Sequence, residues 1–168
     1  MPLIKGENPH HPQLGSTIKV DPIRDKRAIK RIKTLLADHP RNYCLFVLGI
    51  NTAYRANELL SLTVRQVRGL QAGDVLDLKQ RKTHKYRPVT LNKTAIAAIE
   101  KLLDAQSIGD DDPLFAGRRG PLLTSTVSTM VKTWCKNVGL RGNYGSHTLR
   151  KTWGYWQRVD SGTAVPLL

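Results

Sequence analysis

Residues 41–53 form a segment that would be apolar on nearly every side if it were an α-helix. Its centre, from Cys44 to Ile50, contains no charged side chain. A helix without a polar face has to be surrounded by other elements. The segment therefore predicts a central buried helix, and the 168 residues of the chain are enough for one domain packed around it.

The segments on either side of this run predict mostly helices. Asp21-Pro22 favours a helix start, Asn92 is a good cap for a later helix, and Gly139 is a typical helix end. Further helices are therefore expected from Pro22 to His39, from Asn92 to about Ser107, over 124–138, and from the His147 region to about Val159. The expected apolar stripe of the first of these consists of Ile29, Ile32, Leu35 and Leu36.

Two short strands are expected over 75–78 and 86–91, joined as a hairpin. The predicted fold class is thus mainly α with a small antiparallel β-hairpin (α+β). Residues 1–21 contain several prolines and glycines and little apolar periodicity, which predicts a flexible arm or the remnant of a linker. Residues 22–168 are expected to form the folded domain.

The chain carries 27 Lys and Arg against 13 Asp and Glu, a formal net charge of +14. Such an excess favours a nucleic-acid partner, because bound cations neutralise phosphates and release counterions. A membrane partner is disfavoured, because no run is apolar enough to span a bilayer and no basic amphipathic helix has an aromatic face. We expect a protein of the cytoplasm or nucleoid, in which Cys44 and Cys135 are free buried thiols. His10-His11 has no partner at ligand spacing, so no metal site is expected.

Two short motifs place an arginine where it suits a bound phosphate. His147 and Arg150 are three residues apart, so a helix opened by Gly145-Ser146 would bring both side chains to one face. Arg55 follows the buried run directly, and Glu58 is spaced to hold its guanidinium in position. Each motif also has a plainer interpretation: a solvated surface pair for the first, and a structural ion pair at a helix boundary for the second.

The turn between the two expected strands carries four cations and a histidine, and a second basic turn lies near residue 118. Such turns are often charged loops that keep an edge strand soluble, but on a chain this basic they also suit contact with a DNA backbone. The candidate DNA-binding residues are Lys79, Arg81, Lys85, Arg87, Arg118 and Arg119.

Taken in order, three motifs resemble the catalytic domain of tyrosine recombinases, the phage integrases, over residues 22–168. They are Thr-x-x-Arg55-x-x-Glu58-Leu, a basic hairpin with Lys82 before Arg87-x-Val-x-Leu, and His147-x-Leu-Arg150. The resemblance implies attack of a tyrosine hydroxyl on a DNA phosphate, giving a 3′-phosphotyrosyl link, with neither a metal nor another cofactor. It also implies that Arg55 and Arg150 stabilise charge on the phosphoryl oxygens. Lys82 would protonate the departing 5′-oxygen, His147 would hydrogen-bond the phosphate and help to move the tyrosine proton, and Glu58 would support the site.

The sequence departs from the family at its end. The family's nucleophilic tyrosine is expected roughly thirty residues beyond the second arginine, but only 18 residues follow Arg150 (168 − 150). Tyr155 is the sole tyrosine among them, and we expect it to pack with Trp153 and Trp156 rather than to attack DNA. Lys151 stands where the family often has a histidine and is given no role. Residues 22–168 thus predict an incomplete catalytic domain, inactive as it stands.

The leading hypothesis is a fragment of a site-specific DNA recombinase that acts in integration or recombination by strand cleavage and rejoining. Its expected partners are double-stranded DNA and, on DNA, further copies of itself. A second hypothesis is a non-catalytic DNA-binding protein derived from a recombinase. A third, an RNA-binding protein, has no stacking-aromatic motif in its favour.

Overall fold

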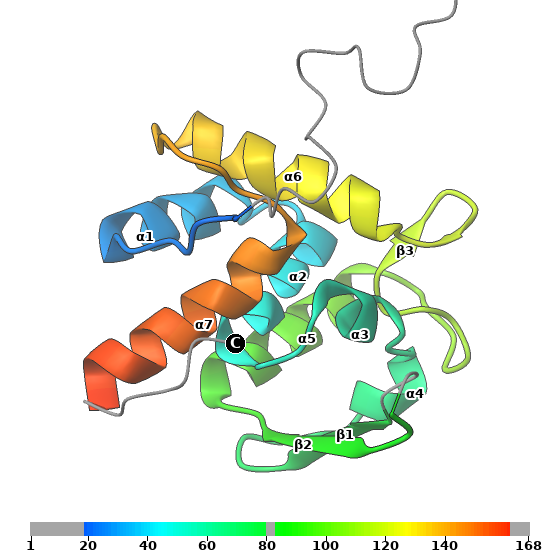
Figure 1. Cartoon of the computed structure of the whole chain (residues 1–168). Coiled ribbons are helices and arrows are strands. Elements are labelled where there is room, and N and C mark those ends of the chain that lie inside the picture. Colours follow the sequence, from blue (N-terminus) through cyan, green and yellow to red (C-terminus); the bar gives the residue numbers. More distant parts are fainter. Residues whose placement is uncertain (1–18, 80–82, 162–168) are drawn as a thin grey trace, which may run out of the picture.

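The computed structural model describes residues 19–79 and 83–161, which form one helical body with two small hairpins (Figure 1). The fold class expected from the sequence is confirmed. No helix in these ranges is long and apolar enough to cross a membrane. The elements are α1 (Lys26–Leu35), α2 (Pro40–Asn51), α3 (Ala56–Leu60), α4 (Val64–Val67), β1 (Val75–Lys79), β2 (Tyr86–Thr90), α5 (Lys93–Ala105), β3 (Ala116–Gly117), β4 (Gly120–Pro121), α6 (Thr124–Asn137) and α7 (Ser146–Ser161).

Helix α2 is the centre of the core, as predicted. Its residues from Cys44 to Gly49 are all buried, and α1, α3, α5 and α7 pack against it. Pro40 starts the helix, where the missing N–H of proline costs nothing. Figure 1 shows α7 crossing in front of α2, with the β1–β2 hairpin at the lower edge of the molecule. Both cysteines are buried and free, and burial raises the pKa of Cys135 to about 12.

Helices α2 and α7 approach closely at Gly49. A Cβ atom at this position would lie 2.5 Å from Cδ1 and 2.8 Å from Cβ of Leu149. Real Cβ atoms do not come so near another carbon, so glycine is what allows the two helix backbones to meet here. The contact fixes the distance between α7 and α2, and α7 carries His147 and Arg150.

The β1–β2 hairpin is anchored to the core by Tyr54. The buried Tyr54 hydroxyl lies 2.8 Å from the carbonyl oxygen of Leu76 on β1 and 2.7 Å from that of Arg87 on β2. Burial, with help from the carboxylates of Asp77 and Glu58, raises the pKa of Tyr54 to about 12, so the hydroxyl keeps its proton. Both strands are therefore fastened to the segment that precedes α3.

The first helix begins later than predicted. Asp25, not Asp21, caps α1 by accepting a hydrogen bond from the Arg27 N–H at 2.8 Å. Asp21 instead accepts from the Asn143 N–H at 3.0 Å, far along the chain. The expected stripe is also narrower, because Leu35 is 42% exposed and lies outside the core.

The ordered domain includes the end of the segment that was predicted to be an arm. The carbonyl oxygens of Lys19 and Val20 accept hydrogen bonds from Asn143 and Lys151, at 2.8 and 3.0 Å. Packing therefore begins by Lys19, before the expected boundary at residue 22. Residues 1–18 of that arm, and the carboxyl-terminal 162–168, lie outside the described residues.

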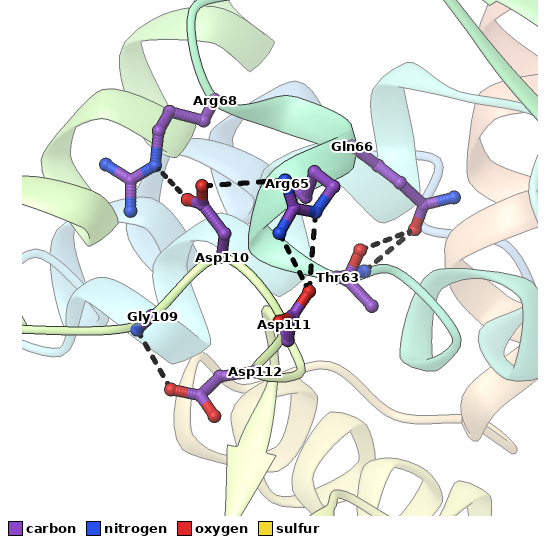
Figure 2. A network of polar contacts seen from close by, with 8 residues as sticks. All are labelled: Thr63, Arg65, Gln66, Arg68, Gly109, Asp110, Asp111 and Asp112. Atoms are coloured by element: carbon purple, nitrogen blue, oxygen red, sulfur yellow. Dashed lines mark hydrogen bonds and ion pairs between the residues drawn. The ribbon is translucent and has the colours of Figure 1, made fainter.

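Three acidic residues lie next to one another on one loop, and each accepts hydrogen bonds from nearby groups of the protein (Figure 2). Asp111 accepts from Arg65 at 3.0 Å, Asp110 accepts from Arg68 at 2.6 Å, and Asp112 accepts from its own loop at Gly109 N–H. These ion pairs are exposed and contribute little to stability. The ion pairs do bind the loop before β3 to α4, and they turn the side chains of Asp110 and Asp111 toward α4.

Candidate functional site

The first turn of α7 presents two of the predicted site residues. Thr148 closes the turn: its hydroxyl accepts from the Gly145 N–H at 2.9 Å, and its own N–H donates to the Gly145 carbonyl at 3.0 Å. Thr148 and Leu149 face the core, so His147 is exposed and Arg150 is partly buried on the other side of the helix. Helix α7 begins at Ser146, where the sequence predicted its start.

Arg55 stands immediately before α3 with an extended backbone (φ −72°, ψ 160°), and its side chain is exposed. The expected pairing of its guanidinium with Glu58 is wrong. Glu58 folds back to accept from the Arg55 main-chain N–H at 3.0 Å, and its ion pair is with Arg87, at 3.2 Å. The three-residue spacing aligns side chains only inside a helix, and Arg55 precedes the helix as its cap.

Arg55, Arg87 and Glu58 lie near enough to Arg150 for their charges to act on it, although of the three arginines only Arg87 pairs with the carboxylate through its side chain. Helix α3 packs against α7, and the positive charges of Arg55 and Arg87 both act on Arg150. Burial, with the charges of Arg87 and Arg55, lowers the pKa of Arg150, while Glu58 opposes this shift. Three guanidinium groups against one carboxylate leave an excess of two positive charges. Such a cluster attracts an anion that presents several oxygens, such as a phosphate.

The carboxylate itself is enclosed. The Glu58 side chain is 10% exposed, and its Oε2 atom is buried without a hydrogen-bond partner within the described residues. Arg87 is 21% exposed and also donates to the Ala53 carbonyl oxygen at 2.7 Å. The cluster therefore has a rigid inner part, Glu58 with Arg87, and an outer part in which Arg55 faces solvent.

Comparison with known proteins decides the family. Residues 25–157 match the phage integrase family. The chain is also 32% identical, over 139 residues, to the probable integrase/recombinase YoeC of Bacillus subtilis (strain 168), an alignment that covers 81% of this chain and 74% of that protein.

This chain belongs to the phage integrase family.

Solved structures of three recombinases have a similar fold. The XerA recombinase matches with a TM-score of 0.70 and 21% identity, covering 89% of this chain and 54% of that one. The XerH recombinase bound to its difH substrate before cleavage matches at 0.68 and 22%, covering 89% and 46%. The catalytic core of lambda integrase matches at 0.61 and 17%, covering 84% and 85%. The chain thus spans about half the length of the two Xer recombinases.

The other predicted residues that the structure describes lie on the two hairpins. Lys82 and Arg81 fall outside the described residues, and Lys79 ends β1 opposite Tyr86. Lys85 is exposed on the β1–β2 hairpin. Arg118 and Arg119 are exposed on the turn of the second hairpin, beyond the amino-terminal end of α6 (Figure 1).

Arg87 does not occupy the DNA-contact position expected of it, because its guanidinium points inward to Glu58. The sequence held a signal for this. Exposure alternates along β2, where Tyr86, Pro88 and Thr90 are exposed while Arg87 and Val89 are partly buried. Arg87 thus shares a face with Val89, and the alternation of side chains along a strand would have turned both toward the core.

Tyr155 lies away from the site, on the α1 side of the integrase fold. Its ring meets Trp156 edge-on, with centroids 5.0 Å apart, and the Arg24 guanidinium lies 5.8 Å from its centroid. Five helical residues after Arg150 correspond to a rotation of about 140° around the α7 axis. The expectation that Tyr155 packs with Trp156 is confirmed.

Two hollows of the described surface lie outside the arginine cluster. One, of about 300 Å³, is lined by Lys132, Lys136 and residues 140–144; the other, of about 310 Å³, lies between α1 and Trp156. A phosphate-binding site for DNA needs no hollow at the arginine cluster, because a DNA backbone is bound on an open surface rather than in a closed cavity.

Proposed function

We propose that this chain is part of a site-specific DNA recombinase, with a site that binds the phosphate at which a strand is cut and rejoined through a 3′-phosphotyrosyl link. The observation that carries the proposal is that Arg55, which precedes α3, lies near enough to Arg150 of α7 for their charges to interact, next to the enclosed ion pair of Glu58 with Arg87. Membership of the integrase family supports it.

The chemistry suits these side chains. Arg55 and Arg150 each donate two hydrogen bonds from a permanently charged plane, which stabilises charge as it develops on the phosphoryl oxygens. His147 is exposed one turn before Arg150, within reach of the same phosphate. Lys82, which lies outside the described residues, is assigned to the departing 5′-oxygen by its place in the motif alone. No cofactor has a role in this scheme.

The partners follow from the same proposal. Double-stranded DNA is the substrate, in the cytoplasm and on the nucleoid. Two related structures are a lambda integrase dimer on a core site and a lambda integrase tetramer on a Holliday junction. We therefore assign to this chain association with further copies of itself on DNA.

DNA binding through the cluster is tested by a salt titration. The affinity for a duplex should fall steeply with salt, and the logarithmic slope should be smaller by about 1 in the Arg55→Ala/Arg150→Ala variant, at about 0.9 for the one phosphate that both arginines contact. Arg65→Ala is the control, because Arg65 is occupied by the acidic loop. A slope that is the same in the double variant and in the parent chain would contradict the proposal.

A second candidate, a DNA-binding protein without cleavage activity of its own, is favoured by the position of Tyr155. We expect no covalent protein–DNA product from nicked suicide substrates, because phosphate activation requires a nucleophile held in line. Denaturing electrophoresis measures this directly. A covalent band that is lost in Tyr155→Phe would show that Tyr155 is the nucleophile.

A further inference from the structure

Arg87 joins three parts of the molecule that the proposed function needs in fixed positions. Its side chain donates to Glu58 Oε1 at 3.2 Å and to the Ala53 carbonyl oxygen at 2.7 Å. Its own carbonyl oxygen accepts from the Tyr54 hydroxyl at 2.7 Å. The residue therefore binds β2 to the segment on both sides of Arg55.

These contacts leave Arg87 poorly suited to hold DNA. Both terminal nitrogens of the guanidinium donate to protein oxygens, and only 21% of the side chain is exposed. A phosphate contact would have to draw the group away from Glu58, which is 10% exposed and would be left as a buried charge. Leaving a buried charge without its partner is strongly unfavourable.

The position of Glu58 depends on Arg87 in turn. Glu58 Oε1 is the acceptor for both the Arg55 main-chain N–H and the Arg87 guanidinium. Because the two groups share one carboxylate oxygen, a shift of β2 that moves Arg87 would also move Glu58 and, with it, the backbone of Arg55. Arg87 also lies close enough to Arg150 to lower its pKa, so all three arginines belong to one electrostatic unit.

We propose that Arg87 is a positioning residue of the recombinase site: through Glu58 and Ala53 it sets the backbone of Arg55. The inference rests on the proposed function and deepens it. Arg87 acts on the phosphate through Arg55 rather than by touching it.

A thermodynamic cycle of DNA affinity separates positioning from direct contact. Arg55→Ala and Arg87→Lys should each weaken duplex binding by about tenfold, the size of one charged hydrogen bond. The double variant should be no more than about twofold weaker than Arg55→Ala, because Arg87 has nothing left to position. A double variant about a hundredfold weaker than the parent chain would show two independent contacts and overturn the proposal.

The choice of lysine makes the test specific. Lysine keeps the positive charge at residue 87, so a direct electrostatic contact would survive, with its salt slope unchanged. It cannot span Glu58 and the Ala53 carbonyl as a planar guanidinium does. Positioning therefore predicts that Arg87→Lys and Arg87→Gln behave alike, whereas retention of full affinity by Arg87→Lys would refute it. Thermal unfolding curves of the variants identify a temperature at which all of them are folded, and the DNA affinities are compared at that temperature.

A measurement without DNA keeps this inference separate from the proposed function. The backbone ¹H–¹⁵N resonance of Arg55 should shift in Arg87→Lys, since its acceptor moves, but not in the control Arg68→Lys, at a residue that follows α4 and pairs with Asp110 of the acidic loop. If Arg55→Ala leaves DNA affinity unchanged, the proposed function fails while this resonance still decides the role of Arg87. An Arg55 resonance that does not move would overturn the positioning role.

Discussion

Replacement of Gly49 by valine is expected to destabilise the fold by about 3 kcal/mol, at the upper end for overpacking in a core. The new Cβ would lie 2.5 Å from Cδ1 of Leu149, and the branched side chain adds two more methyl groups at the same place. Helix α7 has to move away from α2 to admit them. The free energy of unfolding, from urea titration followed by circular dichroism, measures the cost.

Gly154→Val is the matched control, since Gly154 lies in α7 and a Cβ there meets nothing within 4 Å. Its stability should stay within about 0.5 kcal/mol of the parent chain, because valine is a somewhat better helix former than glycine. If both variants lost the same stability, the cause would be valine in a helix rather than the contact with Leu149. The displacement of α7 by Gly49→Val should also weaken DNA binding, because Arg150 moves with the helix.

Glu58→Gln is expected to cost about 2 kcal/mol of stability. Removing one partner of a buried ion pair typically costs 3–5 kcal/mol, and the cost should be lower here because Arg87 keeps a fifth of its surface in water. Glutamine retains an oxygen for the Arg55 N–H, so the loss is mainly one of charge. Three arginines are then left together with no anion between them.

An added anion should restore much of this loss. Sulfate resembles a phosphate, and we expect it to bind the arginine cluster of the folded state more tightly in Glu58→Gln. The stability difference between this variant and the parent chain should therefore narrow as the sulfate concentration is raised. Sodium chloride at the same ionic strength should narrow it less, because screening alone acts weakly on partly buried charges. Asp111→Asn, at a carboxylate that is 90% exposed, should change stability by less than about 0.5 kcal/mol. If sulfate stabilised Glu58→Gln and the parent chain equally, the anion would bind somewhere other than the arginine cluster.

The local pattern of the sequence was enough to place most elements. A buried α2 follows from a segment without a polar face, and α5 begins where Asn92 accepts from the Ala95 N–H at 2.8 Å. Helix α6 ends before Gly139, whose φ of +80° suits glycine best. The motif around His147 also lies on the helix predicted for it. Each of these features depends on residues within a few positions of one another, which is why periodicity and caps reveal them.

What the sequence could not determine was the choice among partners far apart in the chain. Asp21 and Asp25 are both good helix caps, and only the hydrogen bond from Asn143, 122 residues away, assigns Asp21 elsewhere. Glu58 has Arg55 nearby in sequence, yet its ion pair is with Arg87, 29 residues on. The packing of the hairpin on Tyr54 and of α7 on Gly49 decides these pairings, because a side chain binds the partner that the folded backbone brings within reach, and local spacing carries no information about that distance.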